Sequence, residues 1–136
     1  MSLLFSPTGF LKVGGAVLLA LGLIGYTGLV TIKDFFDLDA GENIAHTVLG
    51  IVALAVAFGI KNDQLHRWLV IVVAVIALFF GVYGFLVAGQ ARPNTFGLAN
   101  LENPADNILH LVVGAWAVAA VMLNRGEMKM PMTGKA

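Results

Sequence analysis

Four long charge-free segments restrict the fold of this chain more than any other feature of its sequence. They are 18 to 24 residues long and cover residues 13–32, 43–60, 68–91 and 107–124. An α-helix rises about 1.5 Å per residue, so each segment can cross the hydrocarbon core of a bilayer, which is about 30 Å thick. Because lipid offers no hydrogen-bond partners, the backbone of such a segment must bond to itself, as it does in a helix.

The sequence therefore predicts an all-α fold, a four-helix transmembrane bundle that forms a single domain over residues 1–136. The expected helices cover residues 10–32, 41–60, 67–90 and 104–124. Charged residues make up 12% of the chain, against about 25% in soluble domains. A soluble fold with this composition would expose large apolar patches, so membrane lipid is the expected surrounding.

Charge and cysteine content exclude several classes of function. The formal net charge is zero and no basic stripe is present, which excludes nucleic acid as a partner. The chain has no cysteine, so disulfides and cysteine-ligated metal centres are excluded. The spacings of a Ser-His-Asp triad, a glycine-rich phosphate loop or a metalloprotease helix are absent. We therefore expect a protein that is not an enzyme.

The distribution of Lys and Arg predicts the orientation in the membrane. Six of the eight lie before the first charge-free segment, between the second and the third, or after the fourth. The remaining two lie in the other two loops, which also hold most of the acidic residues. Since cytoplasmic loops are enriched in Lys and Arg, both termini and the tail 125–136 should be cytoplasmic. The expected location is the bacterial plasma (inner) membrane.

An internal repeat divides the chain into two halves. Residues 39–55 align with residues 103–119 at an offset of 64. The matched pairs are Glu42 and Asp106, Asn43 and Asn107, Ile44 and Ile108, His46 and His110, and Gly50 and Gly114. The first and third expected helices share a weaker Gly-x-x-Gly element. The chain thus reads as two copies of a helical hairpin, whose small residues permit close helix packing.

The repeated histidines are the main candidates for function. His46 and His110 each lie 15 residues before a basic residue, Lys61 and Arg125, which corresponds to about 22 Å along a helix. Both imidazoles should therefore lie at the same depth, near the acidic end of the bundle. Ionisable residues inside a membrane usually face the bundle interior and are functional candidates by default.

One hypothesis for these histidines is a b-type haem or a chlorin. Imidazole is a standard axial ligand of haem iron. Gly50 and Gly114, one turn deeper, would remove side chains where the ring would lie. The cofactor-binding residues would then be His46, His110, Gly50 and Gly114. The pattern resembles transmembrane cytochromes b, which place ligands on alternate helices, although it has only one histidine per helix.

A second hypothesis is a divalent metal site. Glu42 and Asp106 lie four residues before the histidines, on the same helix face, and the ligand set would be Glu42, His46, Asp106 and His110. The alternative for the acids is helix capping.

In the capping interpretation, Asp39 and Asn103 are N-caps and Pro104 is the first helical residue. We expect Asn43 and Asn107 to form a buried polar network with the histidines, with hydrogen bonds between helices. His66 lies in a polar turn, and we expect it to be solvated at the interface.

The Asn-x-x-His-x-x-x-Gly elements resemble those of a family of small bacterial four-helix membrane proteins, a domain of unknown function. The best match is Ala-Asp-Asn-Ile-Leu-His-Leu-Val-Val-Gly at residues 105–114, and residues 42–50 match fairly. That family usually has a further histidine upstream of the asparagine in the second helix, where Asp39 stands here. The resemblance covers about half of the chain and implies the four-helix topology.

The expected role is structural: an accessory subunit that packs against other membrane proteins or against further copies of itself. Cofactor or metal binding by the paired histidines is the alternative. Small-solute or lipid binding, or transport, is a further alternative. Beyond the histidines both helices are apolar as far as Ile60 and Leu123, which disfavours a conductive path.

Overall fold

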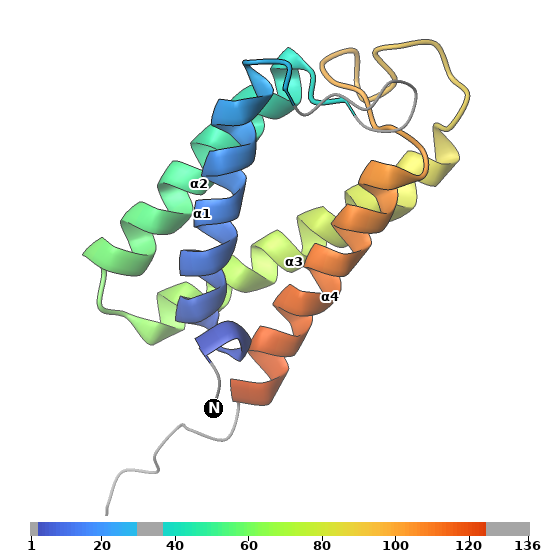
Figure 1. Ribbon diagram of the computed structural model, residues 1–136. Helices are drawn as coiled ribbons and strands as arrows, with labels where there is room; N and C mark the ends of the chain where they lie inside the picture. The colour runs from blue at the N-terminus through green and yellow to red at the C-terminus, as the bar shows by residue number, and fades with distance from the viewer. Residues whose placement is uncertain (1–2, 30–36, 125–136) are drawn as a thin grey trace, which may run out of the picture.

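The protein is an all-α bundle, as the sequence predicts. A computed structural model describes residues 3–29 and 37–124 (Figure 1). The elements, in chain order, are η1 (Leu3–Phe5), α1 (Pro7–Gly25), α2 (Ala40–Gly59), α3 (Asp63–Leu86) and α4 (Ala105–Leu123). Each of the four α-helices is long and apolar enough to cross a membrane. The tail 125–136, predicted to be cytoplasmic, lies outside the described residues.

The first and third helices do not have the predicted bounds. α1 begins at Pro7 because the hydroxyl of Ser6 accepts a hydrogen bond from the Gly9 amide at 3.1 Å. It ends at Gly25 rather than at residue 32 and is followed by a turn in which Gly28 has a positive φ of 69°. α3 begins at Asp63 rather than 67, since Asn62 accepts from the Leu65 amide at 3.0 Å. The predicted bounds differ because a charge-free segment shows only how far the apolar sequence extends, whereas the capping residue determines where the helix begins.

The second helix is capped as predicted, but the fourth is not. Asp39 and Glu42 form the predicted capping box at the start of α2. The N-cap of α4 is Pro104, without a capping side chain. Asn103 does not cap this helix because its Oδ1 accepts instead from the side-chain Nδ2 of Asn107 at 3.0 Å.

The helices pair as two hairpins, α1 with α2 and α3 with α4. Contacts between the hairpins involve mainly α1 with α3 and α4, and α1 begins at the end of the bundle where α4 ends (Figure 1). We call this the core end, because it holds the buried apolar cluster. That cluster consists of Phe10, Leu11, Ala57, Val70, Ala74, Ala117, Ala120 and Val121.

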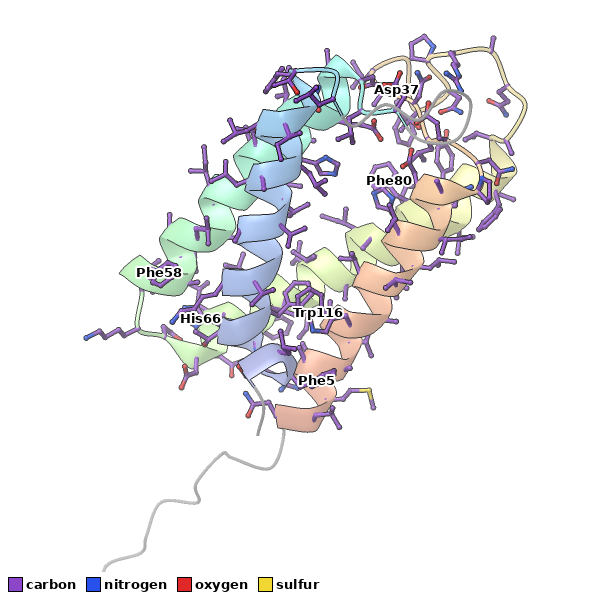
Figure 2. The ribbon with its side chains drawn as sticks, in the orientation of Figure 1. Phe5, Asp37, Phe58, His66, Phe80 and Trp116 are labelled. Atoms are coloured by element: carbon purple, nitrogen blue, oxygen red, sulfur yellow. The ribbon has the colours of Figure 1, made fainter. Side chains whose placement is uncertain are left out.

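Two polar contacts fasten the core end. The indole Nε1 of Trp116 donates to the Leu4 carbonyl at 2.7 Å, and its ring packs on Phe10 with centroids 4.5 Å apart (Figure 2). Arg67 Nη1 donates to the Val121 carbonyl at 2.9 Å, near the end of α4. The opposite end, where Asp39 and the 87–104 connection lie, we call the loop end. There the Asn100 amide donates to Asp39 Oδ2 at 2.6 Å and links the two hairpins.

The same contact between asparagine and glycine occurs inside each hairpin. A Cβ on Gly25 would overlap Oδ1 of Asn43, and a Cβ on Gly84 would overlap Oδ1 of Asn107. Both amide oxygens are buried without a hydrogen-bond partner. Such close approach is typical of interfaces where Cα–H groups lie against oxygen atoms. The parallel supports the repeat inferred from the sequence.

Substituting Gly84 by alanine should therefore destabilise the protein by about 1–3 kcal/mol, because the new methyl group overlaps the Asn107 amide in a closely packed interface. Gly59→Ala is the matched control, since its Cβ would meet nothing within 4 Å. That change should be neutral or stabilising by about 0.5–1 kcal/mol, as expected when alanine replaces a helical glycine. Thermal unfolding in detergent measures both. Equal behaviour of the two variants would contradict the packing role of Gly84, and Asn107→Ala should relieve the effect of Gly84→Ala.

Candidate functional site

Three carboxylates meet at the loop end. Glu42 comes from the first turn of α2, Glu102 from the connection before α4, and Asp106 from the first turn of α4. One oxygen from each lies within 4.8 Å of the others, and all three side chains are buried. This cluster, called the carboxylate triad below, joins residues from both hairpins.

The capping box positions the first member of the triad. Glu42 Oε2 accepts from the Asp39 amide at 3.1 Å, and Asp39 Oδ1 accepts from the Glu42 amide at 2.9 Å. The other oxygen of Asp39 holds Asn100, which lies two residues before Glu102. The cap of α2 thus also fixes the connection that carries Glu102.

Backbone bonds position the other two members. Asp106 Oδ2 accepts from the Glu102 amide at 2.7 Å, and the Asp106 amide donates to the Glu102 carbonyl at 3.0 Å. The Glu102 side chain is 4% exposed. Its Oε1 forms an ion pair with Arg92 at 3.4 Å, whereas its Oε2 is buried without a hydrogen-bond partner. The side chain of Arg92 is 59% exposed, so water weakens the only positive charge paired with the triad in the described chain.

The triad holds more negative charge than its surroundings compensate. Burial, and after it the neighbouring Asp106 carboxyl, raises the pKa of Glu102 to about 7, while Arg92 acts in the opposite direction. The repulsion between neighbouring carboxylates in a buried site can be reduced either by a bound proton or by a bound cation. The arrangement can therefore bind one or the other.

The triad oxygens lie close enough together to be considered as ligands of one divalent cation. Two ligands of one cation can be no farther apart than twice the metal–ligand distance. That limit is about 4.6–5.2 Å for Ca²⁺ and about 4.0–4.2 Å for Mg²⁺, from their usual bond lengths. Each pair of triad oxygens lies within 4.8 Å, which meets the limit for Ca²⁺; because 4.8 Å is an upper bound, it does not discriminate between the two ions.

The predicted metal ligands are only partly brought together. Glu42 and Asp106 meet, but His46 and His110 do not belong to the group. Sequence reasoning did not single out Glu102. Its position four residues before Asp106 could have pointed to it. An acid in the first turn of a helix can accept a hydrogen bond from the backbone amide of a residue just before the helix, here Glu102.

The two repeated histidines lie one turn deeper than the acids, and both are half-buried. His110 Nδ1 lies 2.7 Å from the Asp106 carbonyl, which can only accept, so Nδ1 carries a proton and donates it in this contact. The His110 ring also lies 6.0 Å from that of Phe80. Nδ1 of His46 is buried without a partner.

The glycines proposed to make room for a ring serve helix packing instead. A Cβ on Gly50 would collide with the backbone of Leu19 in α1, and a Cβ on Gly114 would collide with Leu78 in α3. Both glycines therefore face the partner helix within their own hairpin. The amides of Asn43 and Asn107 likewise donate locally, to the Leu38 carbonyl at 3.2 Å and to Asn103.

The prediction that His66 is solvated is wrong. This side chain is 3% exposed and lies at the core end (Figure 2). Its Nε2 is 3.2 Å from the Val56 carbonyl and its Nδ1 is 2.7 Å from the Thr8 hydroxyl, so it joins α1, α2 and α3. The reason is the early start of α3, which places residue 66 in the first helical turn rather than in a polar loop.

Comparisons with family models, with curated proteins and with solved structures give no match to this chain. The interpretation of the site therefore rests on its residues and their geometry.

The raised pKa of Glu102 predicts how stability depends on pH. The group titrates near 4.5 when unperturbed and at about 7 in the folded chain, so between these values the folded state binds more protons. Stability should therefore fall as pH rises from about 4.5 to 7, since the penalty per unit of pKa difference is about 1.4 kcal/mol. Melting temperatures in detergent at pH 5 and pH 8 test this. Glu102→Gln should flatten the profile; an unchanged pH dependence in that variant would refute the assignment.

Proposed function

We propose that this protein is an accessory subunit of the bacterial plasma membrane that packs against other membrane proteins or further copies of itself. The observation that carries the proposal is how little of each helix the bundle covers. Only 22 to 33% of each candidate span is buried, and large apolar side chains are exposed on all four helices. Surface of this kind, interrupted by small residues, suits helix–helix association within lipid.

Two further features support this role. The chain carries no spacing typical of catalysis. The excess of Lys and Arg at the core end supports an orientation with that end in the cytoplasm. The resemblance to small bacterial four-helix membrane proteins agrees with this setting, and we propose membership of that family on the strength of the shared motif.

Single-cysteine variants test the accessory role, because the chain has no cysteine of its own. A photoactivatable maleimide crosslinker is attached in native membranes to one exposed position on each helix. The positions are Val17, Ile51, Val75 and Val112. A partner should give discrete adducts from one or two helices only, and the fully buried Ala117 supplies the matched control. Lipid-only crosslinking from all four helices, with extraction as a lone monomer, would exclude the proposal.

Cation binding at the carboxylate triad is the second candidate function. It is favoured by the buried Glu102 Oε2, which has no partner although it belongs to a cluster of three acids. A calcium ion would neutralise the triad and occupy that oxygen. Chemically this would be a structural site, since a bound ion would tie α2 to the start of α4.

Calcium should accordingly raise the melting temperature. A ligand that binds only the folded state stabilises it by about 2.7 kcal/mol at one hundred times its Kd. The rise should be absent in Glu102→Gln and retained in Asp63→Asn, which removes an acid at the opposite end of the bundle. If the wild type and Glu102→Gln respond alike to calcium and to a chelator, the triad is not the site.

A further inference from the structure

An open pocket lies at the core end, away from the carboxylate triad. Its volume is about 370 Å³, and it is formed by the first turns of α1, the last residues of α2 and the start of α3. Two lysines line it, Lys12 and Lys61, together with Phe58 and Asp63. His66 and Thr8 close one side, where they bond to each other.

The lysines give this pocket a net positive charge. Neither Lys12 nor Lys61 forms a salt bridge within the described part of the chain, although Asp63 lines the same pocket. Lys12 Nζ lies 4.7 Å from the centroid of the Phe58 ring. That contact holds the ammonium group over the pocket without neutralising it.

The position of the pocket defines what can reach it. Phe58 near the end of α2 and Ile60 just after it are exposed apolar side chains beside the charged Lys61. This is where an apolar span gives way to polar residues, which corresponds to the headgroup level of a bilayer. A ligand that fits both features needs an anionic group for the lysines and an apolar part for Phe58. At this depth in a bilayer, a phospholipid has both.

We infer that this pocket binds the phosphate group of an anionic phospholipid, with Lys12 and Lys61 as its ligands. Basic pockets between transmembrane helices are suited to such headgroups. The acyl chains would follow the exposed face of α2 from Phe58 towards the middle of the span. This inference is independent of the accessory role and of cation binding at the triad.

The test uses the full-length protein in a non-ionic detergent. Phosphatidylglycerol and phosphatidylcholine with identical acyl chains are titrated in, and bound lipid is counted by native mass spectrometry. Phosphatidylglycerol should bind more tightly. Each of Lys12→Gln and Lys61→Gln should weaken it about fivefold, given the usual contribution of one basic residue near a charged headgroup. Replacing both lysines by arginine should preserve the preference, and Asp63→Asn should maintain or strengthen it.

Three outcomes would overturn the inference. The first is equal binding of the two lipids by the wild type. The second is an unchanged lipid preference when both lysines are replaced by glutamine. The third is displacement of the lipid by sn-glycerol 3-phosphate at equal concentration, which would assign the pocket to a soluble phosphate rather than to a lipid.

Discussion

Close contact between a glycine on one helix and a polar side chain on the next is the interaction on which this bundle depends. Lipid supplies no hydrophobic force that would drive apolar helices together, so association relies on dispersion and shape. Gly25 and Gly84 allow Asn43 and Asn107 to reach the neighbouring backbone. Tight pairing within the hairpins leaves the contact between hairpins to a short apolar cluster and to the connections at the loop end.

The two ends of the bundle are consequently held by different forces. At the core end, apolar side chains from all four helices form the cluster, and His66 adds hydrogen bonds among three of them. At the loop end, Asp39 ties its own helix cap to Asn100 in the other hairpin. That single side chain brings together acids which repel one another, because its hydrogen bonds fix the backbone on both sides of the triad.

Much of this architecture could be predicted from the sequence. The lengths of the charge-free segments alone predicted four helices, and the Asp-x-x-Glu pattern correctly predicted the cap of α2. The equivalence of Glu42 and Asp106 correctly placed both acids at one end. Glu102 could not be found in this way because its burial depends on how the connection between α3 and α4 folds back over α2. His66 was missed because the length of an apolar run does not reveal that Asn62 begins the helix.

The paired glycines show a different limit. Gly50 and Gly114 were predicted to leave space for a ring between α2 and α4, yet the same absence of a side chain serves close packing against α1 and α3. A glycine in a helix indicates that another group packs closely against the helix at that position. Which group this is depends on the direction in which the helix turns that position, and the sequence does not give this direction.

The link between Asp39 and Asn100 has a mechanical consequence. The apolar cluster at the opposite end does not respond to ions or protons, whereas the acidic connections do. A change of charge around the triad would therefore act on the contact between Asp39 and Asn100, while the apolar cluster still joins the hairpins at the other end. Of the two contacts that join the hairpins, the one at the loop end is thus the one exposed to the ionic conditions on its side of the membrane.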